Sequence, residues 1–297
     1  MLFNRPVLAY RLAMTEFLKM HGLGNDFIIF DWRRGGVETV SAAAARALAD
    51  RRRGIGCDQI LVIRPSDKAD IRMDILNHDG SLSGACGNGT RCVADLVMAE
   101  DATGTLSIET DGAMLRAWRA DHGEIAVDMG PVSTGWDEVP LAHEADTLAV
   151  PLGVDGLDPA ICHSLGNPHA VVFVEDAEAV DLANIGPRVE TSPLFPQRVN
   201  FSVVSQLPDG ALRMRVWERG VGITMACGSG ACAVGVAVAR SGRGPASNRI
   251  VMDGGAVRID WDETSRHVVM TGPVAHVARG ALSAEMTSRL EGRDGTA

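Results

Sequence analysis

The sequence predicts an α+β protein whose two lobes are homologous and arose by internal duplication. Apolar segments with the period of β-strands recur along the chain, and a few helical segments interrupt them. The motif Cys-Gly-x-Gly occurs twice, at 86–89 and 227–230, and each copy opens an apolar helix that carries another cysteine. A pattern that restarts in this way is the signature of a repeated domain.

The first half alternates strands with two helices. Residues 71–77 carry an apolar side chain at alternate positions, as a half-buried strand requires. Ser41 is a favoured N-cap residue, and the alanine-rich run after it predicts a helix over 42–50. A second helix is expected over 87–98. The other expected strands are residues 16–20, 27–30, 59–63, 105–109, 114–119 and 124–129.

The second half follows a segment of a different character. Residues 130–159 are rich in proline, glycine and acidic side chains, which favours a crossover between lobes. A helix is then expected over 228–240, and the polar tail after Met286 is expected to fray. The strands expected in this half are residues 169–174, 199–204, 211–217, 249–252, 257–261 and 267–270.

These elements define the expected domains. Residues 15–131 are expected to form the N-terminal lobe, and a C-terminal strand at about 273–284 is expected to return to it. Residues 132–272 are expected to form the C-terminal lobe. Residues 1–14 are expected to be an extension outside the fold.

Composition excludes several kinds of partner. The net charge is −10, and no segment gathers Lys and Arg, so we expect no nucleic acid. No apolar run reaches the ~18 residues that a membrane helix needs, so we expect no membrane. The first residues do not resemble a secretory signal, and the six cysteines are therefore expected to stay reduced in the cytoplasm.

Polar residues keep matched distances from the two repeated cysteines, which are Cys86 and Cys227. The pairs are Asn77 and Glu218, nine residues before their cysteine; Gln59 and Asn200, 27 before; and Asn25 and Asn167, 61 and 60 before. We interpret these matches as equivalent positions of one duplicated site.

A cysteine just before a helix is suited to acid–base chemistry. The helix dipole and the free N–H groups favour the thiolate, so we expect the pKa of both thiols to fall. The glycines let those N–H groups approach an anion such as a carboxylate. Two such cysteines on opposite sides of one carbon would allow one to remove a proton and the other to return one, which inverts a stereocentre.

Other interpretations of the cysteines are weaker. Cys57, Cys92, Cys162 and Cys232 are expected to be apolar core residues. The Cys-x5-Cys and Cys-x4-Cys spacings do not fit the close ligand pairs of a zinc site, so we expect no metal. Lys19 and Lys68 are the only lysines, and neither context suggests a pyridoxal Schiff base, so we expect no cofactor.

The polar residues also have structural alternatives, judged singly. Asn25 and Asn77 precede acidic and glycine residues and could be turn residues. Glu218 and Arg219 could form an exposed ion pair, and His169 could be a structural histidine. The repeated spacing favours the functional interpretation.

The sequence resembles the diaminopimelate epimerase family over nearly the whole chain. The motifs that carry the resemblance are Lys-Met-His-Gly-Leu-Gly-Asn-Asp-Phe at 19–27, Asp-Gln at 58–59, Asn-x-Asp-Gly at 77–80, Ala-Cys-Gly-Asn-Gly-Thr-Arg-Cys at 85–92, Gly-Asn-Pro-His at 166–169, Arg-Val-Asn at 198–200, Glu-Arg-Gly at 218–220 and Ala-Cys-Gly-Ser-Gly at 226–230. It implies two α/β lobes, each a mixed sheet wrapped around a central helix, with the active site in the cleft between them.

The resemblance also implies an activity and a site. The activity is cofactor-independent conversion of LL-2,6-diaminopimelate to the meso form, with Cys86 donating and Cys227 accepting a proton in the LL direction. His169 and Glu218 are expected to tune the thiols. The residues expected to bind the substrate are Asn25, Gln59, Asn77, Gly87, Asn88, Asn167, Asn200, Glu218, Arg219, Gly228 and Ser229.

Some features leave alternatives open. Ile223 stands where many relatives carry a glutamate, which we interpret as tolerated variation. Ala278 stands where relatives often place an aromatic residue of a dimer contact, so a homodimer is left open. A proline or hydroxyproline racemase of the same fold is the main alternative, although such an enzyme should not need a second carboxylate clamp. A module that only binds amino acids is a second alternative, and a redox or metal protein that uses the six thiols is a third.

Overall fold

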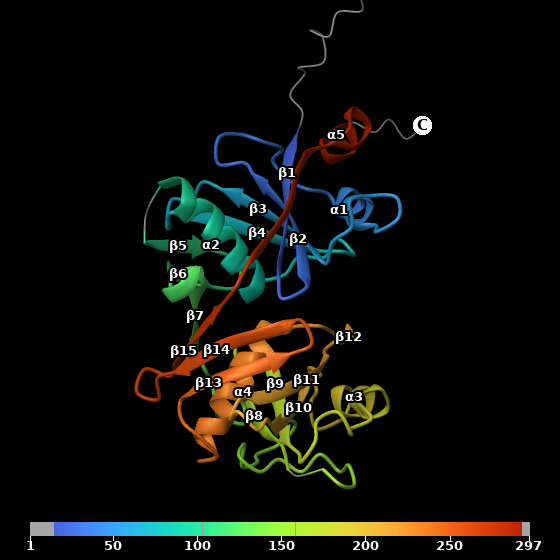
Figure 1. The fold of residues 1–297 in the computed structure, drawn as a ribbon. Helices are drawn as coiled ribbons and strands as arrows, with labels where there is room; N and C mark the ends of the chain where they lie inside the picture. The colour runs from blue at the N-terminus through green and yellow to red at the C-terminus, as the bar shows by residue number, and fades with distance from the viewer. Residues whose placement is uncertain (1–14, 102–103, 158, 293–297) are drawn as a thin grey trace, which may run out of the picture.

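The computed structural model describes residues 15–101, 104–157 and 159–292. Two α+β lobes lie one above the other in the view of Figure 1. The upper lobe holds the blue to green part of the chain, and the lower lobe holds the yellow to orange part. The red strand β16 runs back across the upper lobe to the C-terminal helix α5.

The first half of the chain supplies the upper lobe. Its elements are β1 (Glu16–Gly22), β2 (Asn25–Asp31), α1 (Ala42–Ala49), β3 (Gln59–Arg64), β4 (Ile71–Asn77), α2 (Gly87–Asp101), β5 (Thr105–Glu109), β6 (Met114–Arg119), the short 3-10 helix η2 (Asp121–Gly123) and β7 (Ile125–Pro131). Two elements from the end of the chain join them, β16 (Ala275–Ala281) and α5 (Ala284–Leu290). β16 pairs with β1 in antiparallel orientation.

The second half repeats the same order of elements. They are β8 (Ile161–Ser164), β9 (Pro168–Phe173), α3 (Leu182–Glu190), β10 (Asn200–Gln206), β11 (Leu212–Glu218), the two-residue β12 (Gly222–Ile223), α4 (Gly228–Arg240), β13 (Ser247–Met252), β14 (Gly255–Trp261) and β15 (His267–Gly272). β12 aside, each strand and each α-helix has a counterpart in the first half.

Strand pairing shows the duplication directly. From β1 to β7 the successive neighbours are antiparallel, parallel, antiparallel, parallel, antiparallel and antiparallel. From β8 to β15, omitting β12, the same sequence of orientations recurs. β7 and β15 pair with each other in antiparallel orientation, so the two copies join into one continuous sheet. Outward from this pair, the strands of the two copies follow each other in the same order.

Each half of the continuous sheet wraps around one helix. α2 contacts strands β1, β2, β5, β6 and β7, and α4 contacts strands β8 to β11 and β13 to β15. Ten residues of α4 are buried, because strands surround it on nearly every side. Close packing requires glycine at Gly235, where a β-carbon would lie 2.5 Å from Ile259. The central helices therefore have little freedom to move relative to their strands, which fixes the start of each helix in space.

The expected fold class is confirmed, and most expected elements are present. The sequence analysis missed β8 and α3. Helix α3 contains Gly186 and Pro187, two residues of low helix propensity, although Asp181 caps its N-terminus by accepting from the amide of Asn184. The expected fraying after Met286 is wrong up to residue 290, because α5 continues and Leu290 is only 2% exposed. The expected extension 1–14 lies outside the described residues.

Candidate active site

Each repeated cysteine caps the helix that follows it. Cys227 is the N-cap of α4, and its Sγ accepts a hydrogen bond from the amide of Gly230 at 3.4 Å. Cys86 Sγ accepts from the amide of Gly89 at 3.4 Å, the equivalent contact at the start of α2. A β-carbon at Gly230 would lie 3.2 Å from Cys227 Sγ and 2.7 Å from Met214. The second glycine of each motif therefore gives the sulfur access to a backbone donor.

The starts of α2 and α4 meet at the junction between the lobes. The two helices contact each other, and a β-carbon at Gly228 would lie 3.3 Å from Oδ1 of Asn88. A β-carbon at Gly87 would lie 2.5 Å from Cε of Met270, which belongs to the neighbouring strand β15. The first glycine of each motif thus permits close approach, and Figure 1 shows both helix starts between the lobes.

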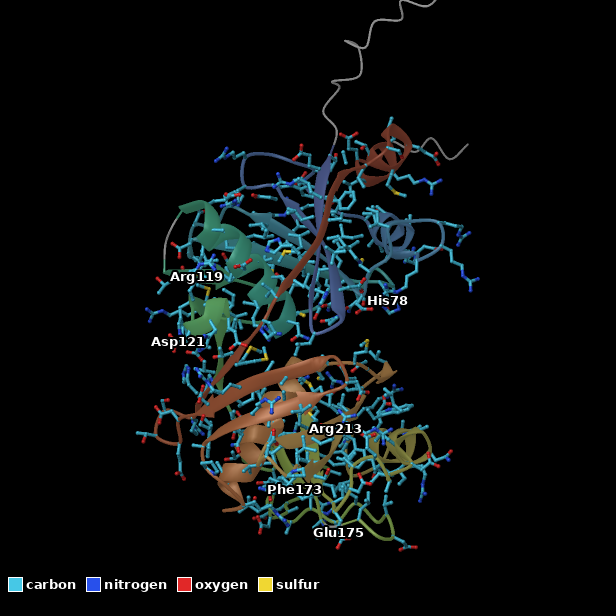
Figure 2. All side chains as sticks on the ribbon, viewed as in Figure 1. His78, Arg119, Asp121, Phe173, Glu175 and Arg213 are labelled. Atoms are coloured by element: carbon cyan, nitrogen blue, oxygen red, sulfur yellow. The ribbon has the colours of Figure 1, made fainter. Side chains whose placement is uncertain are left out.

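In the first lobe, three of the expected binding residues form two hydrogen-bonded groups. Gln59 and Asn77 are opposite each other on β3 and β4, and Gln59 Nε2 donates to Asn77 Oδ1 at 2.9 Å. Asn25, at the start of β2, donates from Nδ2 to Asp58 Oδ2 at 3.0 Å. His78 follows Asn77 and lies on the side of this lobe that faces the other (Figure 2).

In the second lobe, the equivalent residues connect directly to α4. Asn167 Nδ2 donates to Ser229 Oγ at 3.4 Å, and Asn167 Oδ1 lies 3.1 Å from Nε2 of His169. Asn200 fixes the segment after β11, because its Oδ1 accepts from the amide of Arg219 at 3.0 Å. Nη1 of Arg219 donates to the carbonyl of Gln197 at 3.0 Å.

Glu218 is the acidic group that the structure places beside the thiols. It accepts a hydrogen bond from Oγ1 of Thr224, and it influences the pKa of the Cys227 thiol. Burial raises the pKa of the Glu218 carboxyl. The same carboxylate raises the pKa of the Cys86 thiol, which belongs to the other lobe. Glu218 therefore acts on both cysteines.

The expected lowering of the thiol pKa is wrong for this structure. Burial, the largest cause, raises the pKa of Cys86 to about 11, although the amide of Gly89 acts in the opposite direction. Burial raises the pKa of Cys227 well above its usual value, and Glu218 raises it further. The reason is that the helix N-terminus stabilises a thiolate by less than the removal of water destabilises it.

The buried environment of His169 keeps its ring uncharged. It is fully buried, and burial lowers its pKa to about 3, so the ring is neutral at physiological pH. Its Nε2 contacts the side-chain oxygen of Asn167 and not a sulfur atom. Any influence of His169 on Cys227 therefore passes through the orientation of Asn167 and Ser229.

Glu190 is a site-supporting residue that the sequence analysis did not find. This buried carboxylate at the end of α3 accepts from Nε1 of Trp217 at 2.6 Å and from the amide of Gly220 at 2.9 Å. It thereby holds both ends of the segment that carries Glu218 and Arg219. The missed helix α3 explains the omission, because no residue within the motifs indicates a partner at this distance along the chain.

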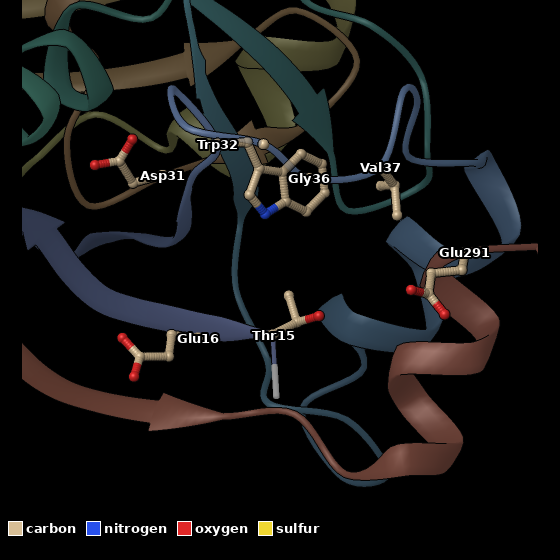
Figure 3. Close-up of a pocket in the computed structure, with 8 residues that line it drawn as sticks. Thr15, Glu16, Asp31, Trp32, Gly36, Val37 and Glu291 are labelled. Carbon is tan, nitrogen blue, oxygen red and sulfur yellow. The ribbon is translucent and has the colours of Figure 1, made fainter. Parts of the chain in front are cut away.

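A separate hollow lies far from the cysteines. It has a volume of about 430 Å³, and Figure 3 shows it between the start of β1, the end of β2 and α5. Its lining includes Asp31 and Trp32, whereas Asn25 at the other end of β2 is near Cys86. A strand of seven residues spans roughly 20 Å at ~3.3 Å per residue, so this hollow is not part of the site.

Comparison with known proteins identifies the family. The family model described as "Diaminopimelate epimerase" matches residues 17–135 and 161–277, one segment for each copy of the repeat. The chain belongs to the diaminopimelate epimerase family. A relative from Rhodospirillum centenum named diaminopimelate epimerase is 52% identical, over 91% of this chain and 93% of its own length. Another with the same name, from Erythrobacter litoralis, is 47% identical, over 90% of this chain and 97% of its own length.

Solved structures agree on the fold of this family. A structure titled as a probable proline racemase from Agrobacterium radiobacter K84 has a TM-score of 0.66 at 15% identity, over 93% of this chain and 98% of its own. A hydroxyproline epimerase from Agrobacterium vitis has a TM-score of 0.61 at 15% identity, over 91% of each chain. At this identity the likeness concerns the fold alone.

Proposed function

We propose that this protein is an isomerase that converts LL-2,6-diaminopimelate to meso-diaminopimelate without a cofactor. Cys227 removes the α-proton from one face of the substrate carbon, and Cys86 delivers a proton to the opposite face. The observation that carries the proposal is the meeting of two equivalent Cys-capped helices, one from each copy of the repeat, at the junction between the lobes. Two acids or bases on opposite sides of one carbon suit inversion better than any single-base reaction.

The helix starts are suited to the α-carboxylate. The first turn of a helix leaves N–H groups without intrahelical partners, and those at Gly87, Asn88, Gly228 and Ser229 belong to α2 and α4. Donors from both helices then stabilise the charge that develops on the carboxylate when the α-proton leaves. This stabilisation is needed because the α-proton of an amino acid is very weakly acidic.

The amide and charged residues are suited to the rest of the substrate. Oε1 of Gln59 is buried and has no hydrogen-bond partner among the described residues, so it can accept from a substrate ammonium. Glu218 can pair with an ammonium, and Arg219 can bind the distal carboxylate through two N–H groups. Asn25, Asn77, Asn167 and Asn200 add neutral hydrogen bonds, which suit a zwitterion because they add no net charge.

Because burial raises the pKa of both thiols, each is protonated in the free protein and can act as an acid. Both are held as thiols in the free protein: Cys86 donates to Asn25 Oδ1 at 3.8 Å, and burial and Glu218 raise the pKa of Cys227. An acid is therefore ready at either side, and the base forms only when one thiol loses its proton. A substrate ammonium beside Glu218 would neutralise that carboxylate and remove one cause of the high pKa of Cys227.

Incubation in deuterated water tests the reaction. LL-diaminopimelate without added cofactor should acquire deuterium at one α-carbon and yield the meso form, because the proton delivered comes from a solvent-exchanged thiol. Proline should acquire none, since it has no second carboxylate for Arg219. Mass spectrometry of both amino acids measures the exchange, and exchange of proline alone would show that the racemase alternative is correct.

Location and assembly are further proposals. Among the described residues, no helix is long and apolar enough to cross a membrane. We place the protein in the cytoplasm, where its free cysteines stay reduced. We also propose a homodimer through β16, because within the described part of the chain this strand pairs with β1 alone and exposes Val277 and Ala278. Sedimentation velocity should give twice the monomer mass, and a monomer at micromolar concentration would contradict the dimer.

A further inference from the structure

Arg91 is a buried cation whose role the proposed reaction does not explain. It lies on α2, five residues after Cys86, and has no exposed surface. Among the described residues it forms no ion pair with a carboxylate. Its guanidinium donates to Asn88 Oδ1 at 3.0 Å and to the sulfur of Met270 at 3.1 Å, and its Nε has no partner. Burying an unpaired guanidinium costs several kcal/mol, so a compensating function is expected.

The hydrogen bonds of Arg91 begin a chain that runs in one direction. Nη2 of Arg91 donates to Asn88 Oδ1, and Nδ2 of Asn88 donates to Asn25 Oδ1 at 3.3 Å. Nδ2 of Asn25 then donates to Asp58 Oδ2 at 3.0 Å. The chain therefore starts at a cation and ends at a carboxylate, and each amide receives through oxygen and donates through nitrogen.

The charged ends determine which way each amide faces. An amide group turned by 180° would direct its NH₂ at the Arg91 guanidinium or its oxygen at the Asp58 carboxylate, and both contacts are repulsive. The orientation of the chain leaves Asn25 Oδ1 facing Cys86, where it accepts from the thiol at 3.8 Å. The atom that faces the thiol thus depends on Arg91, which is connected to Asn25 by two successive hydrogen bonds through Asn88.

We propose that Arg91 is a positioning residue for Cys86, which it controls by fixing the amide of Asn88 and, through it, the oxygen of Asn25 that accepts a hydrogen bond from the thiol. This proposal rests on the proposed function in one respect only, namely that Cys86 acts as the acid. The hydrogen-bond chain itself is present without substrate. The buried charge of Arg91 also stabilises the thiolate that forms once the proton has been given to the substrate.

The electrostatic surroundings agree with this assignment. Arg91 lowers the pKa of the Cys86 thiol, whereas Glu218 from β11 raises it, and these two are the charged groups that face Cys86. Cys92 on the same helix, Cys232 on α4 and Glu124 face Arg91 itself. Arg91 is therefore the cation that faces the Cys86 thiol among the described residues.

Alkylation of Cys86 tests the proposal without any substrate. The measurement uses iodoacetamide between pH 6 and 10 in a Cys227→Ala background, so that Cys86 is the reactive member of the pair. In Arg91→Met the alkylation rate at pH 8 should fall ~10-fold, because each unit of thiol pKa changes the thiolate fraction tenfold. Arg91→Lys keeps the charge and should stay within ~3-fold of its parent.

Turnover of diaminopimelate provides the second measurement. With Cys227 present, Arg91→Met should lower kcat at least ~10-fold with little change in KM, and Arg91→Lys should restore much of it. Arg240→Met is the matched control, because Arg240 is also without an ion pair to the described residues and donates only to Cys162 and Thr147. That variant should keep the alkylation profile and kcat.

The outcomes separate the two proposals. An unchanged alkylation profile in Arg91→Met would overturn the role of Arg91, whatever the activity of the enzyme. Slower alkylation in Arg91→Met, together with a failure of the unsubstituted enzyme to exchange diaminopimelate, would support the role of Arg91 and refute the proposed function. If Arg91→Met does not fold, Arg91→Gln removes the charge and keeps a polar NH₂ group on a shorter side chain, and it should still slow alkylation; an unchanged rate there would also overturn the proposal.

Discussion

Alanine at Cys227 or at Cys86 is expected to abolish epimerisation of diaminopimelate. Loss of one general acid or base typically costs ~10²–10⁴-fold, and in the proposed mechanism each thiol serves its own face of the carbon. Each variant should lower kcat by at least ~10²-fold in deuterated water, measured as deuterium at the α-carbon. The affinity for substrate should change much less, because the backbone donors and Arg219 stay in place.

Matched variants of other cysteines control for structural damage. Cys92 and Cys232 lie on the same two helices, six and five residues after the repeated cysteines, and both are fully buried. Cys92→Ala and Cys232→Ala should keep kcat within ~3-fold, since the loss of one small apolar group perturbs packing only modestly. If a control variant were as inactive as Cys227→Ala, or if both site variants exchanged normally, the two-base mechanism would be wrong.

The spacing that indicated the repeat has a structural cause. Gln59 is opposite Asn77 in the antiparallel pair of β3 and β4, 18 residues apart. The equivalent residues Asn200 and Glu218 are also 18 residues apart and lie on the antiparallel pair of β10 and β11. A hairpin of fixed length brings its two ends together in both lobes, and for this reason the sequence spacing reflects the same position in each hairpin.

Burial explains what the sequence did not predict. A cysteine before a helix was expected to have a low pKa, but α2 and α4 start inside a junction between lobes, where water is excluded. No local motif records which side chains from the other lobe cover a residue. Glu190 was missed for a related reason, since its partners Trp217 and Gly220 lie about 30 residues away and α3 has a weak helix signal.

Glu218→Gln is expected to change binding and thiol reactivity in opposite directions. The isosteric amide keeps an oxygen for Thr224 but removes the charge that we propose pairs with the substrate ammonium. Since loss of one partner of a buried charge pair costs about 2–5 kcal/mol, kcat/KM for diaminopimelate should fall at least ~30-fold. The carboxylate raises the pKa of Cys227, so its removal lowers that pKa and increases the thiolate fraction at pH 8.

The two measurements together distinguish this mechanism from simple damage to the fold. In a Cys86→Ala background, iodoacetamide should alkylate Cys227 several-fold faster in Glu218→Gln than in its parent, while circular dichroism and Tm stay the same. Glu178→Gln is the control, because Glu178 pairs with Arg213 at an exposed position and should alter neither rate. Slower alkylation of Cys227 in Glu218→Gln would mean that Glu218 assists ionisation of the thiol by removing its proton, and Glu218 would then be the base that activates Cys227.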